Sequence, residues 1–296
     1  MGEYRYLHLD VFTDEAMTGN QLAVFPEPDG LETGQMQRVA NEMNFSETTF
    51  VWPAEDPGCD ARVRIFTPQR ELPMAGHPTV GTAFALAETG FLAAGQEATM
   101  FELGVGPTRV ELEWDGQKLS SAWMFQREPV FGEDRFERSE LARALGLVEG
   151  DIDGSLPVMA GSAGVDFLYV PLATREAVDR AWLDAAAAAA LFDSVGHDRI
   201  AAYVFSLEDR GDGVTAYCRM FGAVLGVTED PATGSAAGPL AAYMLRNGRA
   251  TVGEQLVLRQ GVKMGRPSTI MAEVQGDGSV RVGGPAVVVG EGTLRA

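Results

Sequence analysis

The chain has 296 residues, which is too long for one small core and suits two domains of about 150 residues each. Lys and Arg number 23 against 42 Asp and Glu, so the formal net charge is −19, and a surface this acidic argues against binding to nucleic acid or anionic membranes. The two cysteines, Cys59 and Cys218, form no CxxC pair and join no Cys/His cluster, so no metal site is expected.

The N-terminal segment lacks the basic start and apolar centre of a signal peptide. No apolar run in the sequence reaches the ~18 residues that a membrane-spanning helix needs. These features predict a cytoplasmic protein without a membrane partner.

Alternation of apolar and polar residues predicts strands, and apolar stripes at helical spacing predict helices. In the first half we expect strands at 6–12, 22–25, 48–52 and 61–66, and a helix at about 33–43 with Thr33 as its N-cap. In the second half we expect strands at 168–172, 202–205 and 217–221, and a helical stretch at about 180–192.

The order of elements and several short motifs occur twice in the chain. The matching segments are 50–52 with 203–205, 64–66 with 219–221, and 71–76 with 229–234. Matches that keep a common order over a period of roughly half the chain indicate a duplicated domain rather than a solenoid. We therefore expect two similar halves, 1–125 and 126–296, the second including a connecting helical segment.

The repeat is sharpest at two glycine turns that each lead into a helix of small apolar residues. Gly76 and His77 open one helix, and Gly234 and Ser235 open the other. Helices without a polar face must be buried on all sides, so we expect each to be wrapped by the strands of its own half. A helix start presents free N–H groups and the positive end of the helix dipole, which predicts an anion site at each junction.

Several longer segments carry a resemblance to a known family. They are DVF (10–12), GN (19–20), NFSETTF (44–50), RIFTP (64–68), ELPMAGHP (71–78), EDPATGSA (229–236), and QG with MGRPS (260–268). In this order, over nearly the whole chain, they resemble the phenazine-biosynthesis PhzF family. The resemblance implies an α+β fold of the diaminopimelate-epimerase type, with two pseudo-symmetric halves, each a barrel-like mixed sheet around a central helix. It also implies a homodimer that needs no cofactor.

The family's chemistry implies a cofactor-independent isomerase that shifts a proton on a small carboxylate substrate such as trans-2,3-dihydro-3-hydroxyanthranilate. Glu47 matches the family's acid/base glutamate, and it opens an apolar strand, where burial would raise the pKa of its carboxyl and suit it to proton transfer. His77 and Asp230 match the other polar site residues, expected to hold the substrate and assist proton movement.

The remaining candidates are expected to bind substrate rather than react. Gly76, Gly234 and Ser235 would offer N–H or hydroxyl donors to the substrate carboxylate. Asn20 is a weaker candidate, because Gly-Asn is also an ordinary turn.

Two other functions stay open from the sequence. One is an amino-acid epimerase or racemase, although the epimerases of this fold carry a cysteine at the start of each central helix and this chain has none there. The other is a non-catalytic ligand-binding homologue, against which the joint presence of Glu47, His77 and Asp230 argues.

Overall fold

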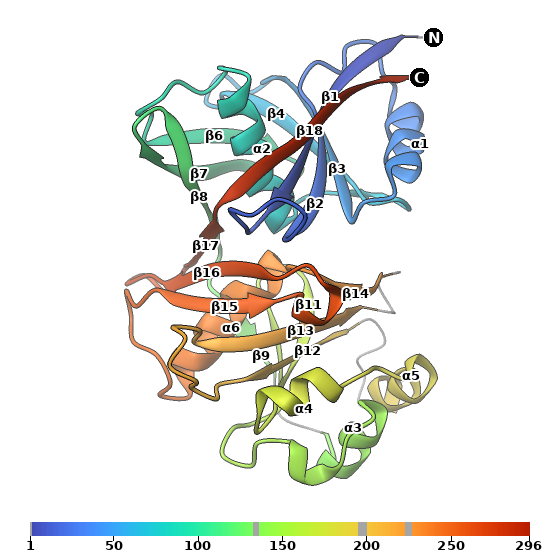
Figure 1. Cartoon of the computed structure of the whole chain (residues 1–296), viewed down its shortest axis with the longest axis vertical. Helices are drawn as coiled ribbons and strands as arrows, with labels where there is room; N and C mark the ends of the chain where they lie inside the picture. The colour runs from blue at the N-terminus through green and yellow to red at the C-terminus, as the bar shows by residue number, and fades with distance from the viewer. Residues whose placement is uncertain (1, 133–135, 195–199, 223–226) are drawn as a thin grey trace. The chain divides into compact units, whose positions relative to one another are not determined.

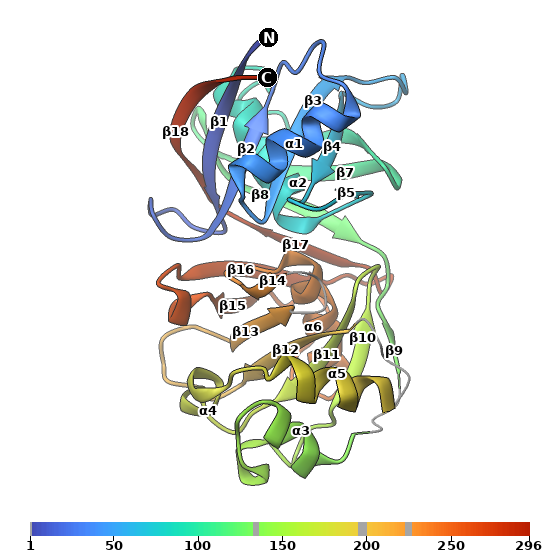
Figure 2. The same cartoon turned by 90° about the vertical axis from the view of Figure 1, so that its right-hand side faces the viewer.

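The computed structural model describes residues 2–132, 136–194, 200–222 and 227–296. The chain divides into two compact units, the first formed by Met1–Phe125 with Val282–Ala296 and the second by Gln126–Arg281. The expected assignment of 282–296 to the second half is therefore wrong. The reason is long-range pairing, because the last strand lies antiparallel along the first strand of the chain, from Glu3 opposite Arg295 to Val11 opposite Ala286. Figures 1 and 2 show these two strands side by side.

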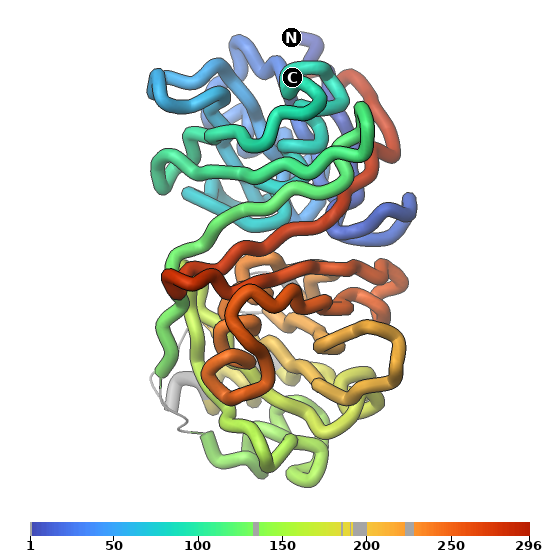
Figure 3. The backbone as a smooth tube through the Cα atoms, turned by 90° about the vertical axis from the view of Figure 1, so that its left-hand side faces the viewer, coloured from blue at the N-terminus to red at the C-terminus, as the bar shows by residue number. Residues whose placement is uncertain are grey.

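The first unit is built from strands of mixed direction with two helices. Its elements are β1 (Glu3–Val11), β2 (Asn20–Phe25), α1 (Thr33–Met43), β3 (Glu47–Pro53), β4 (Ala61–Phe66), β5 (Glu71–Leu72), α2 (Gly76–Glu88), β6 (Ala98–Leu103), β7 (Gly106–Asp115), β8 (Lys118–Gln126, whose last residue enters the second unit) and β18 (Ala286–Arg295). The pairs β2–β3 and β4–β6 are parallel, and the others are antiparallel, including the neighbouring β7 and β8, green in Figure 3.

The helix α2 forms the centre of the first unit. Every residue from Gly76 to Leu86 is buried, as its lack of a polar face predicts, and the helix contacts β1, β2, β3, β7 and β18. Gly81 allows the closest approach, because a Cβ atom there would lie 2.6 Å from side-chain atoms of both Leu22 and Val11.

The helix α1 covers the outer face of the strands. Its buried Met36, Val39 and Ala40 pack with Phe25 and Phe50 in one apolar cluster. Figure 2 shows the helix lying across the strands of this unit. Thr33 was expected to be its N-cap, but it is the first helical residue, and Glu32 precedes it as the cap. The Gln35 side chain accepts a hydrogen bond from the Glu32 backbone N–H.

The second unit repeats the plan with an added helical layer. Its elements are β9 (Val130–Phe131), α3 (Arg138–Ala144), η1 (Glu149–Asp151), β10 (Met159–Ser162), β11 (Asp166–Pro171), α4 (Arg175–Arg180), α5 (Ala185–Ser194), β12 (Ala201–Ser206), β13 (Ala216–Gly222), β14 (Val227–Asp230), α6 (Gly234–Arg246), β15 (Leu256–Gln260), η3 (Val262–Met264), β16 (Ser268–Val274) and the start of β17 (Val280–Gly284). The central helix is α6, which contacts β10 and β16, and the Tyr169 hydroxyl donates to its Ala236 carbonyl.

The helical stretch expected at 180–192 is split in the structure. The helix α4 begins after Thr174, whose hydroxyl accepts from the Ala177 N–H, and it ends at Arg180. The Asp184 carboxylate then accepts from the N–H groups of Ala186 and Ala187, which caps the start of α5. Together with α3, these helices pack against one side of the second unit's strands (Figure 2).

Strand pairing gives the correspondence between the units more accurately than the sequence motifs do. In the first unit Ile65 of β4 lies opposite Thr49, and in the second Met220 of β13 lies opposite Tyr203. Thr49 therefore corresponds to Tyr203, and the sequence match that set Phe50 against Tyr203 is one residue out of register.

Candidate functional site

The candidate residues of the first unit meet at the start of α2. The Nδ1 atom of His77 lies 3.3 Å from Oε2 of Glu47 and 3.4 Å from Nδ2 of Asn20. Asn20 is the first residue of β2 and Glu47 the first of β3, and these two strands run parallel, so their N-terminal ends lie at the same edge. Gly76 is the first residue of α2 and places His77 against this edge.

The imidazole of His77 is deeply buried and therefore neutral at neutral pH. Its side chain is 5% exposed, against 17% for Glu47. Burial lowers the pKa of His77 to about 3, with a smaller opposing effect of the Gln21 backbone carbonyl. The contact with Glu47 is therefore a hydrogen bond of a neutral ring rather than an ion pair.

A neutral ring can accommodate Glu47 in either protonation state. An ionised Glu47 accepts a hydrogen bond from an N–H at Nδ1, whereas a protonated Glu47 donates to the lone pair of Nδ1 in the other tautomer. The Asn20 amide nitrogen can only donate, so its contact is compatible with the second tautomer. A carboxyl that is held in both states has what an acid/base group requires.

The candidate residues of the second unit lie where β14 leads into α6. Asp230 is the last residue of β14 and is buried, with its Oδ2 atom accepting a 2.6 Å hydrogen bond from the Thr233 hydroxyl. Gly234, which is buried, and Ser235, which is partly exposed, form the first turn of α6. The structure thus groups Asn20, Glu47, Gly76 and His77 in one unit and Asp230, Gly234 and Ser235 in the other.

Both helix starts have the character of an anion site. The N-cap residues Ala75 and Thr233 make no side-chain hydrogen bond to the first turn of α2 or α6, which are 13 residues long each. The first-turn N–H groups of these helices therefore receive no capping oxygen from those residues.

The sequence reasoning missed Tyr203, Thr233 and Gln260, which surround Asp230 through a set of buried hydrogen bonds. Gln260 stands in the QG motif noted in the sequence, yet nothing in the pattern says what its amide contacts. Its partners lie 27, 30 and 57 residues away along the chain, so only the fold brings them together.

Neither cysteine is suited to act as a proton carrier. Cys218 is fully buried on β13, and burial raises the pKa of its thiol to about 12. Burial and the nearby Asp56 raise the pKa of Cys59, which lies in the turn before β4. Among the residues that the structure describes, no group of three or more His, Cys, Asp and Glu side chains could hold a metal ion.

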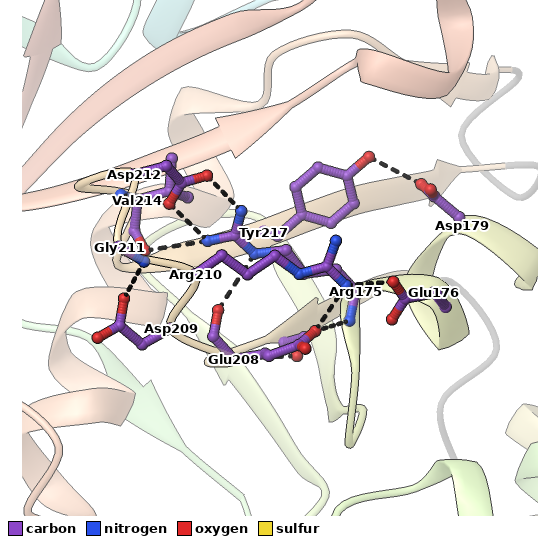
Figure 4. A network of polar contacts seen from close by, with 11 residues as sticks. Arg175, Glu176, Asp179, Glu208, Asp209, Arg210, Gly211, Asp212, Val214 and Tyr217 are labelled. Atoms are coloured by element: carbon purple, nitrogen blue, oxygen red, sulfur yellow. Dashed lines mark hydrogen bonds and ion pairs between the residues drawn. The ribbon is translucent and has the colours of Figure 1, made fainter.

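A second polar cluster lies in the second unit around Arg175 (Figure 4). Its guanidinium donates to both carboxylate oxygens of Asp212, and its backbone N–H donates to Glu208, which also pairs with Arg210. These contacts fasten the loop after β12 to the start of α4. A cavity of about 590 Å³ beside the loop is lined by none of the candidate site residues.

No helix within the described ranges is both long and apolar enough to cross a membrane.

Comparison with known proteins gives consistent matches along the chain. The model of the PhzC-PhzF family, described as phenazine biosynthesis-like protein, matches residues 9–292. A protein of Pseudomonas chlororaphis named trans-2,3-dihydro-3-hydroxyanthranilate isomerase is 37% identical over 299 aligned residues, covering 98% of this chain and 99% of that protein.

Solved structures agree with the fold. A PhzF-family protein of Bacillus anthracis superposes with a TM-score of 0.91 at 28% identity, and the match covers 100% of both chains. A hydroxyproline epimerase of Agrobacterium vitis gives a TM-score of 0.66 at 14% identity, covering 99% of this chain and 92% of that one, and this likeness concerns the fold alone. The predicted α+β, epimerase-like fold is confirmed.

Proposed function

The chain belongs to the PhzC-PhzF family and is an isomerase, and from this we propose that it catalyses a cofactor-independent proton shift on a small carboxylate-bearing substrate. Trans-2,3-dihydro-3-hydroxyanthranilate, on which the Pseudomonas chlororaphis relative is named to act, is the first substrate to test. The observation that carries the proposal is the 3.3 Å contact between Glu47 and a neutral His77.

In this proposal Glu47 is the acid/base group. It accepts a proton from C3 of the substrate and returns a proton at C1 of the same molecule, and the resulting enol becomes the ketone, so no atom is gained or lost. His77 does not compete for the proton, because burial lowers its pKa to about 3. With its proton on Nδ1 it instead keeps a hydrogen bond to Glu47 in both protonation states, because a protonated carboxyl still has a carbonyl oxygen that accepts.

The other candidate residues bind and orient the substrate. Gly76 at the start of α2, and Gly234 and Ser235 at the start of α6, offer N–H and hydroxyl donors suited to a carboxylate or to developing negative charge. Asp230 offers a carboxylate to an amino or hydroxyl group of the substrate. Asn20 contacts His77 and therefore helps to hold the imidazole, in addition to its expected role in binding substrate.

The test is proton NMR of the purified protein with trans-2,3-dihydro-3-hydroxyanthranilate in D2O. We expect isomerisation and loss of exchangeable carbon-bound signals with the wild type and with Glu42→Gln, an exposed glutamate on α1 that serves as the matched control. Glu47→Gln should lose turnover by at least about a hundredfold, the usual scale of a general acid/base contribution. Full activity of Glu47→Gln would remove Glu47 from the reaction.

The amino-acid epimerase alternative predicts a different outcome in the same assay. It requires exchange at the α-carbon of amino or hydroxy acids and persistence of activity in Glu47→Gln. A non-catalytic homologue would bind a carboxylate ligand without any solvent-proton exchange. The homodimer stays a prediction from the family resemblance, to be measured by light scattering.

A further inference from the structure

A chain of buried side chains connects Tyr203 to Asp230 within the second unit. The Tyr203 hydroxyl donates to Oε1 of Gln260 at 2.9 Å, and Nε2 of Gln260 donates to the Thr233 hydroxyl at 2.9 Å. The Thr233 hydroxyl donates in turn to Oδ2 of Asp230 at 2.6 Å. We call these four residues the Gln260 network, and all four are at most 7% exposed.

Backbone groups fix the direction of every bond in the network. The Thr233 backbone N–H donates to Oε1 of Gln260 at 3.2 Å, and Nε2 of Gln260 donates to the Asp230 carbonyl at 2.8 Å. A backbone N–H can only donate and a carbonyl can only accept, so the amide of Gln260 has one orientation. Because the Thr233 hydroxyl accepts from this amide, its single hydrogen is directed to Asp230.

The first unit has the same backbone frame without these polar groups. A Cβ on Gly104 would lie 2.8 Å from the Cα of Pro73, and a Cβ on Gly261 would lie 2.6 Å from the carbonyl oxygen of Pro231. The same glycine–proline approach therefore follows β6 in one unit and β15 in the other. Gln260, which precedes Gly261, thus corresponds to Leu103.

The counterparts of the other members follow from the same frame. Leu72 lies opposite Ile65 as Asp230 lies opposite Met220, and Ala75 precedes α2 as Thr233 precedes α6. Three of the four positions are therefore apolar in the first unit.

The fourth position is not part of any such network in the first unit. Thr49, the counterpart of Tyr203, hydrogen-bonds to Thr82 of α2 at 3.0 Å. A frame that forms with Leu, Ala and Leu at the other three positions does not require the network for folding. Buried polar groups that the fold does not require point to a role at a site.

We propose that Gln260 is a positioning residue for Asp230, acting with Thr233 to hold one carboxylate oxygen and to direct the carboxylate. The proposal rests on the proposed function in taking Asp230 as a group that contacts substrate. Tyr203 and the backbone of Asp230 anchor the amide, the amide directs the Thr233 hydroxyl, and the hydroxyl fixes Oδ2. Preorganised groups of this kind act through geometry, and a small misplacement costs turnover more than binding.

The variants that test this take their residues from the first unit. Gln260→Leu and Thr233→Ala introduce the side chains of the corresponding positions, so the frame is expected to tolerate them. Thr233→Ser keeps the hydroxyl and is the conservative rescue. Gln255→Leu, an exposed glutamine just before the same strand, is the matched control.

With trans-2,3-dihydro-3-hydroxyanthranilate we expect kcat to fall roughly 10- to 100-fold in Gln260→Leu and Thr233→Ala, with KM changed about twofold or less, on the scale of a misplaced catalytic geometry. Thr233→Ser should recover most of kcat, and Gln255→Leu should match the wild type. Equal kcat in Gln260→Leu and wild type would overturn the proposal. So would a fall in kcat for Thr233→Ser as large as that for Thr233→Ala.

A second readout does not depend on turnover. In protein labelled with carbon-13 aspartate, the Asp230 carboxyl resonance is assigned by its absence in Asp230→Asn. It should shift in Gln260→Leu and Thr233→Ala and stay close to wild type in Thr233→Ser and Gln255→Leu. If the wild type does not turn over the substrate, the proposed reaction fails, and this resonance still decides the positioning proposal. An unmoved resonance in both Gln260→Leu and Thr233→Ala overturns it.

Discussion

A bidentate arginine–glutamate pair lies at corresponding positions of the two units, and it should contribute very different amounts to the stability of each. In the second unit Arg219 donates through Nε and Nη2 to Glu229 at 2.8 and 2.9 Å, and through Nη1 to the carbonyls of Val178, Asp179 and Ala181. The two side chains are 9% and 16% exposed.

In the first unit the counterpart pair is more open to solvent. Arg64 donates to Glu71 at 2.7 Å through both Nε and Nη2, and the side chains are 20% and 39% exposed. Within the described part of the chain, its guanidinium makes one further side-chain hydrogen bond, to the Thr33 hydroxyl.

Replacing each arginine by methionine keeps the length of the side chain and removes its charge and donors. Arg219→Met leaves the partly buried Glu229 carboxylate without its cation and removes the donor that three carbonyls at the end of α4 share, which should lower the free energy of unfolding by about 3–5 kcal/mol. Arg64→Met removes a more exposed pair and should cost about 1 kcal/mol or less. We therefore expect a difference of at least ~2 kcal/mol.

Urea unfolding followed by fluorine NMR of 5-fluorotryptophan protein separates the two units. Of the 4 tryptophans, Trp182 alone lies in the second unit, directly after Ala181, whose carbonyl Arg219 contacts. Its resonance should lose its folded signal at lower urea in Arg219→Met, whereas the other resonances should report Arg64→Met. Equal destabilisation by both variants would refute the reasoning from burial.

Three further outcomes follow from charge and packing. The His77 ring should stay neutral from pH 5 to 9 by NMR. Its folded pKa of about 3 lies below the unfolded value, so its contribution to stability is complete above about pH 6.5 and is lost as the pH falls towards 3. His77→Gln should lose this pH dependence of stability. Arg175 lowers the pKa of Asp212, so this carboxylate stabilises the fold above about pH 4 and less below it, and acid unfolding of Asp212→Asn should show a smaller loss. Gly81→Ala should destabilise the first unit by about 1–3 kcal/mol in urea, because its Cβ would lie 2.6 Å from two apolar side chains, and an unchanged midpoint would contradict the close packing of α2.

Local patterns in the sequence predicted the elements that depend on local contacts. The stripe of Met36, Val39 and Ala40 gave α1 with its observed bounds, and the all-apolar composition after Gly76 gave the buried α2. The meeting of Glu47 with Asn20 and His77 required two further facts, the parallel pairing of β2 with β3 and the packing of α2 against both strands, which no local pattern contains.

What the sequence could not supply is the choice of distant partners. The C-terminal strand reads as one more strand of the second half, yet its backbone groups pair with β1 at the other end of the chain. Gln260 reads as the polar end of an alternating strand, and its role depends on side-chain and backbone groups brought together from three other elements. Residue types show which groups can donate or accept hydrogen bonds, but only the fold brings those groups within hydrogen-bonding distance.

The differences between the duplicated units bear on the type of proton transfer. Glu47 begins β3, and the strand register that sets Thr49 against Tyr203 places Ala201 at the corresponding position of β12. His77 corresponds in the same way to Ser235, the second residue of α6. The second unit thus has no carboxyl and no imidazole where the first has both.

A two-base racemase built on a duplicated fold would need an acid/base group at equivalent places in both units. Here the second unit instead has Asp230, and the other members of the Gln260 network hold one of its carboxylate oxygens through a directed hydrogen bond. In the proposed function, one unit moves the proton and the other orients a polar group of the substrate. The proposed proton shift between two carbons of one substrate requires such unlike groups, whereas a two-base inversion at a single carbon requires like groups in both units.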